Sequence, residues 1–279
     1  MPVRTIKGHL RSKDMPASLR AILKTPRSFS DVHHRFIAKA ASEAQGGGDY
    51  DIPNEPPAFD QLEIGACVLN ATVGAAQIVL ANEGLTLPML SRLFPYWLCR
   101  KEMGTLNEDS GTYGELAIDR IARIGICAET LWPYSEANFL DTNGQAVNPD
   151  PTCFPAASDN RPTDWFLVDT PDVSKKLDQL EAAIRSKHPF IFGTPVDSAI
   201  QRYNAGDVLT RPNQNRIIGG HEMVGTGVRY LDGQRVWRVR NSWGTDYGDD
   251  GHLLVDDSWM GWEQLDECYV LTRMDPILL

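Results

Sequence analysis

The sequence predicts an α+β protein whose helical half precedes its β-rich half. Apolar residues recur at helical spacing through much of the first half, and short apolar runs typical of strands fill the second. Two of these runs flank Asp232-Gly233, a strong signal for a two-residue hairpin. Helices followed by strands indicate two segregated layers, and we expect a functional site in a cleft between them.

Four helices are expected. The segment from Cys67 to Glu83 is apolar on almost every face, which is typical of a buried helix, and Gly84 supplies its end. The second contains Leu90, Leu93 and Phe94; Thr86 could cap it, and Pro95 must kink or end it. The third is Gly114–Ile124, with a stop at Gly125, and the fourth is Ser174–Lys187.

The strands are expected after these helices. Their apolar runs are short, as strands usually are. They are Phe190–Val196, Met223–Leu231, Arg235–Trp243, Gly251–Asp256 and Tyr269–Met274. The sequence therefore predicts a helical lobe over about residues 61–140 and a β-rich lobe over about residues 160–275.

Charge divides the chain into a basic arm and an acidic body. Residues 1–40 carry nine Lys or Arg and two Asp, a charge of +7, which leaves −17 for the other 239 residues. Gly46-Gly47-Gly48-Asp49 has the composition of a flexible joint. We therefore predict an arm over residues 1–50 and a body over residues 51–279. The arm is either a solvated tail or a segment that docks on the acidic body, an acidic partner or nucleic acid.

Several classes of protein are disfavoured. No apolar stretch is long enough to span a membrane, and no secretory signal is visible at the start of the chain. A net charge of −10 argues against a general nucleic-acid-binding surface. Five cysteines without a CxxC pair, and histidines without metal-ligand spacing, argue against a disulfide framework or a metal site. We expect no cofactor and a reducing, cytoplasmic location.

Cys67 is the candidate nucleophile. It follows Gly65-Ala66, which allows a tight turn, and it begins the expected buried helix. A helix N-terminus favours the thiolate over the thiol, and the thiolate is the reactive form. The other cysteines are assigned to the core, namely Cys99, Cys127, Cys153 and Cys268.

His221, Asn241 and Gln61 are the candidate partners of this thiol. His221 starts an apolar strand after Gly220 and could take the thiol proton, whereas the other five histidines are assigned to the surface or ordinary core. The amide oxygen of Asn241 could orient the imidazole, with Trp243 shielding that hydrogen bond. The side-chain amide of Gln61 could donate to an oxyanion together with the backbone N–H of Cys67.

These residues in this order resemble the papain family of cysteine peptidases. The family has Gln six residues before the nucleophilic Cys, then a Gly-His strand start and Asn-Ser-Trp-Gly. Here Gln61 lies six residues before Cys67, His221 follows it by 154 residues, and Asn241-Ser242-Trp243-Gly244 begins twenty residues later. The resemblance covers about residues 53–275 and points to the family's disulfide-poor bacterial and viral branch.

The resemblance implies a two-lobed fold, with a buried nucleophile helix packed against an antiparallel, barrel-like β lobe. It also implies a peptidase that hydrolyses peptide or isopeptide bonds of polypeptide substrates, with Cys67, His221, Asn241 and Gln61 as the catalytic residues. Substrate would pair with the backbone near Gly111 and Thr112, with Gly220 and Trp243 also in the binding region. Val68 replaces the family's usual Trp after the nucleophile, and Ile64 stands in the place of a disulfide cysteine.

Two other functions remain open. The fold could serve as a catalytically silent structural or binding component, for example of a virion. Alternatively, the same thiol could catalyse a different acyl transfer, such as deamidation or transpeptidation, which shares the acyl-enzyme and differs in the group that resolves it. If the arm is a latch over the site, deletion of residues 1–48 should raise activity.

Overall fold

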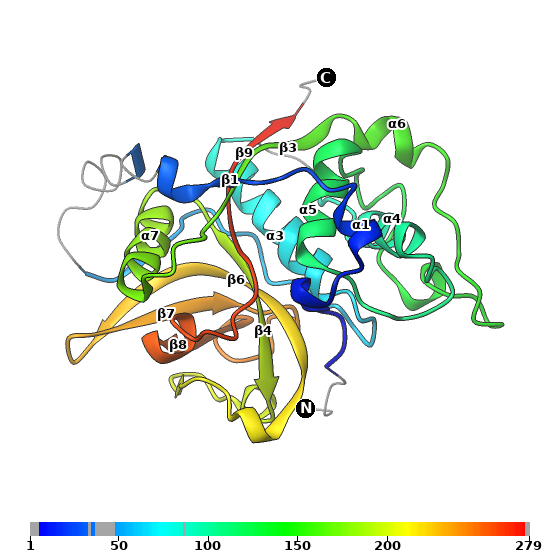
Figure 1. The fold of residues 1–279 in the computed structure, drawn as a ribbon. Coiled ribbons are helices and arrows are strands. Elements are labelled where there is room, and N and C mark those ends of the chain that lie inside the picture. Colours follow the sequence, from blue (N-terminus) through cyan, green and yellow to red (C-terminus); the bar gives the residue numbers. More distant parts are fainter. Residues whose placement is uncertain (1–5, 33–34, 37–47, 86–87, 277–279) are drawn as a thin grey trace.

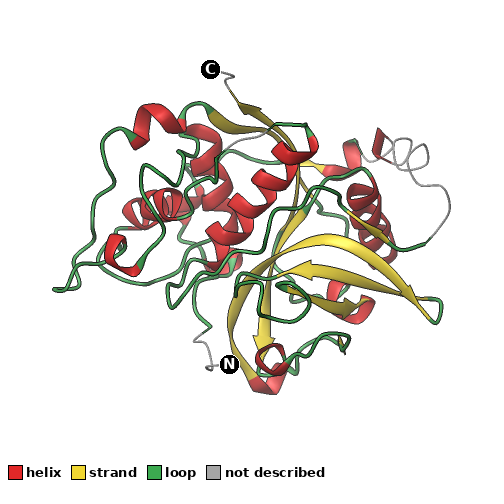
Figure 2. Ribbon diagram, turned by 180° about the vertical axis from the view of Figure 1, so that it is seen from behind, coloured by secondary structure: helices red, strands yellow, loops and turns green. Residues whose placement is uncertain are grey.

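The computed structural model describes residues 6–32, 35–36, 48–85 and 88–276. Figure 1 shows helices gathered on one side and a strongly bent sheet on the other, and Figure 2 shows the same division from behind. Gly46-Gly47 of the predicted joint, Thr86 and the His33-His34 pair lie outside the described residues. No helix in the described ranges has the length and apolar character needed to cross a membrane.

Most of the longer helices lie in the first half of the chain, as predicted. Cys67–Asn82 and Gly114–Arg123 agree closely with the expected segments, and the last long helix precedes the main strands. The helices are α1 (Ala17–Arg20), α3 (Cys67–Asn82), α4 (Leu93–Met103), α5 (Gly114–Arg123), α6 (Cys153–Ala157), α7 (Val173–Arg185) and α8 (Asp257–Met260).

The strands form one mainly antiparallel sheet. Its order is β1-β3-β9-β4-β6-β7-β8-β5, and β2 pairs with β6. The β1–β3 and β5–β8 pairs are parallel. The strands are β1 (Arg27–Ser28), β2 (Tyr50–Asp51), β3 (Asn160–Leu167), β4 (Phe190–Asp197), β5 (Val208–Leu209), β6 (Ile217–Leu231), β7 (Gln234–Arg240), β8 (His252–Asp256) and β9 (Cys268–Pro276).

Helix α3 joins the two lobes. Thirteen of its sixteen residues are buried, as expected for a helix that is apolar on all faces. Its side chains contribute to both apolar cores: Val73 and Ile78 pack with strand residues, whereas Val68 and Leu69 pack with α4 and α5. The residue that begins this helix is therefore held where helices and sheet meet.

The prediction for the next helix was wrong in its bounds. Leu90 lies before α4, and Pro95 sits inside the first turn of the helix instead of ending it. A proline is tolerated there because the first four N–H groups of a helix have no partner within the helix. The side chain of Ser91 accepts a hydrogen bond from the backbone N–H of Phe94 and so satisfies one of these groups.

Two strand predictions also need correction. β3 was not predicted, and β6 begins six residues earlier than expected, at Ile217. The hairpin between β6 and β7 is confirmed: both turn residues have positive φ, 49° at Asp232 and 77° at Gly233. This is the backbone that a two-residue hairpin requires.

The basic arm is folded onto the body over its described length. Its strand β1 pairs with β3, and Phe29 is completely buried in the main core. Met15 and Leu19 pack in the helical core together with the start of α3. Figure 1 shows the blue arm crossing the helical side of the molecule from the N-terminus to β1. A solvated tail is therefore excluded for these parts of the arm.

Candidate active site

Cys67 begins α3 and is completely buried. The preceding turn is held by Asp109, whose carboxylate accepts hydrogen bonds from the backbone N–H of Gly65 (2.9 Å) and the hydroxyl of Tyr96 (2.9 Å). The backbone of Glu222, the residue after His221, lies close enough to the Cys67 sulfur to favour its ionised form. The sulfur therefore lies beside the strand segment that carries the imidazole.

His221 of β6 meets Asn241, which directly follows β7. Nε2 of His221 lies 2.7 Å from Oδ1 of Asn241, and that oxygen also accepts the backbone N–H of Ser242 at 2.8 Å. Because an amide oxygen only accepts, Nε2 of His221 carries the hydrogen, which makes Nδ1 the basic nitrogen of a neutral ring. His221 is 1% exposed, and the ring of Trp243 covers it at a centroid distance of 5.2 Å.

Gln61 is fixed next to this pair. The hydroxyl of Ser242 donates to its Oε1 (2.5 Å), and its own Nε2 donates to the carbonyl of Ile64 (3.0 Å). The backbone N–H of Gln61 also donates to the carbonyl of Ser242 (2.8 Å). A side-chain amide has two N–H donors, so one remains beside the turn that leads into Cys67. The structure thus places all four predicted catalytic residues around the start of α3.

Residues 6–12, the cleft segment of the arm, run across this site. A Cβ added to Gly8 would lie 2.8 Å from Sγ of Cys67 and 2.6 Å from the carbonyl oxygen of Gly65. Gly8 also has φ of +145°, a conformation that other L-residues rarely adopt. Only glycine therefore fits where the cleft segment passes over the sulfur.

The cleft segment pairs with the backbone at two of the predicted substrate-binding residues. Thr112 donates its N–H to the carbonyl of Gly8 (2.8 Å) and accepts the N–H of Leu10 (2.9 Å). Gly111 lies so close to Gly8 that an added Cβ would be 2.5 Å from its carbonyl oxygen. A Cβ on Gly220 would likewise lie 2.6 Å from the carbonyl oxygen of His9. Three predicted substrate-binding residues therefore line the path of the arm, while Trp243 packs on His221.

His9 of the cleft segment is buried between two carboxylates. Its Nδ1 lies 2.9 Å from Glu222 and its Nε2 lies 3.1 Å from Asp266. Burial opposes a charge on the ring, but the hydrogen bonds and charges of Asp266 and Glu222 outweigh it and raise the pKa of His9 to about 9. His9 is therefore an imidazolium ion at neutral pH, and not the surface or ordinary core histidine that the sequence analysis expected.

The covered site holds a neutral thiol and a neutral imidazole. Burial raises the pKa of Cys67 to about 12, and the charge of Glu222 adds to this effect. Burial lowers the pKa of His221 to about 4, and the positive charge of His9 contributes. A thiolate was expected from the sequence at the start of α3. In this conformation the cost of burying a charge outweighs the helix terminus, because the arm covers the sulfur.

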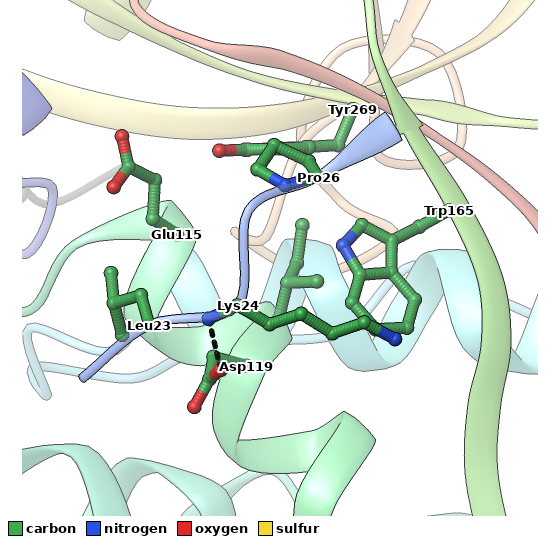
Figure 3. Close-up of a pocket in the computed structure, with 8 residues that line it drawn as sticks. Leu23, Lys24, Pro26, Glu115, Asp119, Trp165 and Tyr269 are labelled. Carbon is green, nitrogen blue, oxygen red and sulfur yellow. Dashed lines mark hydrogen bonds between the residues drawn. The ribbon is translucent and has the colours of Figure 1, made fainter. Parts of the chain in front are cut away.

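Farther along, the arm crosses α5 at a small pocket that contains none of the predicted catalytic residues. Figure 3 shows Leu23, Lys24 and Pro26 of the arm facing Asp119 of α5 and Trp165 of β3. The backbone N–H of Lys24 donates to Asp119 (2.9 Å), and its ammonium lies 4.9 Å from the ring centroid of Trp165. This pocket is part of the seam between the arm and the body.

Sequence reasoning missed three residues at the site. Glu222 stood beside His221 but received no role, and neither Asp266 nor His9 was connected with it. The available signal was an acidic residue between His221 and the apolar run Met223–Leu231, together with a histidine in the basic arm. By contrast, the assignment of the remaining four cysteines to the core is confirmed, since all are buried and free.

Several known proteins resemble this chain in sequence. The model of the papain family of cysteine proteases matches residues 56–271. An uncharacterised peptidase C1-like protein of Acanthamoeba polyphaga mimivirus is 26% identical over 81% of this chain and 73% of its own length. A cysteine proteinase of Theileria annulata is 27% identical over 66% of this chain, but the match spans only 38% of that protein.

Solved structures show the same fold. Xylellain, a cysteine protease from Xylella fastidiosa, superposes with a TM-score of 0.73 at 26% identity and covers 97% of both chains. Procathepsin B S9 from Trypanosoma congolense reaches 0.67 at 18% identity, covering 96% of this chain and 86% of its own, which supports the fold alone. The predicted α+β fold is confirmed, and the protein is a cysteine peptidase that belongs to the papain family.

Proposed function

We propose that this peptidase hydrolyses peptide bonds with Cys67 as nucleophile, His221 as general base and acid, and Asn241 as the residue that orients His221. The observation that carries the proposal is the 2.7 Å contact between Nε2 of His221 and Oδ1 of Asn241. This contact leaves Nδ1 of His221 as the nitrogen that accepts a proton, on a strand where the backbone of the next residue, Glu222, lies close to the sulfur of Cys67.

In the first half of the reaction, Nδ1 of His221 takes the proton of the Cys67 thiol, and the thiolate attacks the carbonyl carbon of the substrate. The resulting oxyanion accepts hydrogen bonds from Nε2 of Gln61 and the backbone N–H of Cys67. As the C–N bond breaks, the imidazolium returns its proton to the leaving amine. A thioester between Cys67 and the acyl group remains.

In the second half, His221 removes a proton from water as the water oxygen attacks the thioester carbonyl. The same two donors stabilise the second oxyanion. When the C–S bond breaks, the carboxylic acid leaves and the Cys67 sulfur regains its proton from the imidazolium. The contact between Ser242 and Gln61 keeps the amide in place through both halves.

The same proposal assigns the cleft segment as a latch that blocks the site. Gly8 lies over the sulfur, so the position that the reacting carbonyl needs is taken. With the segment in place, the buried thiol and imidazole are both neutral, and no ion pair is available for attack. Catalysis therefore requires the cleft segment to move. The free cysteines further support action in a reducing compartment.

Substitution of Cys67 by alanine tests the proposed chemistry. We expect Cys67→Ala to abolish hydrolysis of peptides and labelling by a thiol-directed epoxide or vinyl sulfone. Cys153→Ala, which removes another buried cysteine in α6, serves as the matched control and should retain both. Full activity in Cys67→Ala would overturn the proposal. A product that carries an added amine instead of water would indicate acyl transfer rather than hydrolysis.

A further inference from the structure

We propose that Glu222 and Asp266 form an acidic subsite that selects a positively charged side chain of the substrate, and that His9 of the arm occupies this subsite as a stand-in for it. The inference rests on the proposed function and extends it to the class of peptide that the enzyme prefers.

The pocket is shaped to receive a side chain from the cleft. Gly193 of β4 forms its floor, because a Cβ there would lie 2.0 Å from Cε1 of His9. Glu222 of β6 binds one ring nitrogen, and Asp266, in the segment before β9, binds the other. The backbone of Asp266 is in turn held by the carbonyl of Gly193 at 2.8 Å. These contacts fix a carboxylate on each side of the ring.

Glu222 is not a surface charge that happens to lie near the arm. Its side chain is 2% exposed, and Oε1 has no hydrogen-bond partner among the described residues. The carboxylate lies against the first residue of α5, since a Cβ on Gly114 would be 3.0 Å from Oε2. A buried carboxylate with an unused acceptor is costly unless a cation binds it. Within the described part of the chain, His9 is the cation that does so.

The subsite is directly connected with the reaction centre. Glu222 follows His221 in the chain, and its backbone lies close to the Cys67 sulfur. On the arm, His9 follows Gly8, which lies over that sulfur. A side chain in the place of His9 is therefore one residue from the backbone that covers the nucleophile. When the cleft segment leaves, the two carboxylates remain beside the bond to be cleaved.

A cationic side chain is the partner that this arrangement favours. Both carboxylates accept hydrogen bonds and neither can donate one when ionised. Arginine offers several N–H donors in a fixed plane and lysine offers three, so either could replace the two donors of the His9 imidazolium. A neutral side chain would leave both carboxylates without a counter-charge in a buried pocket. Selection should therefore depend on charge rather than on size.

Matched substrates separate charge from shape. The measurement compares kcat/KM for peptides that differ only in arginine or citrulline, placed in turn at each of the two residues on either side of the cleaved bond. Citrulline keeps the shape of arginine and removes its charge. The full chain carries His9→Ala in every case, so that the native occupant is absent. We expect a preference for arginine of about tenfold or more at one of these positions.

The preference should disappear with the carboxylates. In the His9→Ala background, Glu222→Gln should reduce the ratio of the two kcat/KM values to about threefold or less, and Asp266→Asn should reduce it in part. The ratio cancels changes in the reactivity of Cys67 that either substitution causes. If one variant fails to fold, the other still provides the test. As a control, Asp164→Asn, which removes an exposed carboxylate on β3, should leave the ratio unchanged.

The outcomes distinguish this inference from the proposed function. Equal kcat/KM values for the arginine and citrulline peptides at all positions would overturn the acidic subsite while leaving the peptidase mechanism intact. An arginine preference that survives both substitutions would also overturn it. Turnover that persists after Cys67→Ala would instead contradict the proposed function.

Discussion

Single atoms decide the chemistry of this site. Oδ1 of Asn241 fixes which nitrogen of His221 carries the hydrogen, and the hydroxyl of Ser242 fixes the amide of Gln61. The spacing of these residues could be predicted from the sequence because each belongs to a short motif. The contact of Glu222 and Asp266 with His9 could not be predicted in this way. His9 lies 213 residues before Glu222 in the chain, and only folding brings it between the two carboxylates.

Substitution of Asn241 tests whether its side-chain amide orients His221. We expect Asn241→Ala to lower kcat about ten- to a hundredfold with a smaller change in KM, because His221 loses a buried hydrogen bond worth about 1–3 kcal/mol. Steady-state kinetics of the variant and thermal unfolding would be measured together. A loss in KM alone, with kcat unchanged, would contradict the orienting role.

The charge on His9 makes docking of the arm depend on pH. The groups around it are Glu222, Asp266 and His221, while Glu267 faces the neighbouring Ser12. Because docking raises the pKa of His9 from 6.5 to about 9, its contribution is complete below pH 6.5 and is lost as the pH rises through 9.

The loss of docking at high pH should be visible as a rise in peptidase activity. We expect the activity of the full chain, relative to a chain without residues 1–12, to rise between pH 6.5 and 9. In His9→Gln the rise should be much smaller. A relative activity that falls over this range would contradict the assignment of His9 as a cation in the docked arm.

Helices and strands could be predicted from the sequence wherever a single residue pattern was clear. Helix α3 was predicted because it is apolar on every face, and the hairpin was predicted because Asp232-Gly233 matches one turn geometry. The helix around Leu90 was predicted too early in the chain, because Pro95 was expected to kink or end it. Pro95 instead lies in the first turn of α4. Strand β3 was missed because Arg161, Pro162 and Asp164 interrupt any apolar alternation, although its backbone pairs with β9.

Phe29 shows how the arm depends on this sheet. Its ring is fully buried and packs against Phe36 and Phe166. We expect Phe29→Ala to lower the free energy of unfolding by about 3–5 kcal/mol. Ile22→Ala, at a more exposed site on the same arm, should change it by less than about 0.5 kcal/mol. Urea unfolding of both variants would check this, and equal stabilities would contradict a structural role for the arm.

For the whole molecule, charge complementarity explains how arm and body fit together. Lys7 pairs with Asp109 (2.8 Å), and Arg20 faces Glu115 (3.5 Å), so the basic arm lies along an acidic surface. Docking on the acidic body was one of several alternatives that the charge pattern left open, and the path of the arm was not predicted. The path depends on close backbone contacts at Gly8 and Gly111, which no composition reveals.

Truncations separate the two roles of the arm. Deletion of residues 1–12 removes the cleft segment and keeps Met15, Leu19 and Phe29 in the core, so we expect higher peptidase activity with little loss of stability. Deletion of residues 1–48, which the sequence suggested as a test of a latch, would also remove Phe29 and should destabilise the fold. Unchanged kinetics after deletion of residues 1–12 would argue against a latch.

The most direct test of the account is the pH dependence of Cys67 alkylation, followed by mass spectrometry of the modified peptide. In the chain without residues 1–12, we expect rapid alkylation near neutral pH that stays rapid well below pH 8, because His221 would hold the sulfur as a thiolate. The full chain should react far more slowly at the same pH. Equal rates in both chains, or alkylation that begins only near the pKa of an ordinary thiol, would contradict a reactive Cys67–His221 pair beneath the arm.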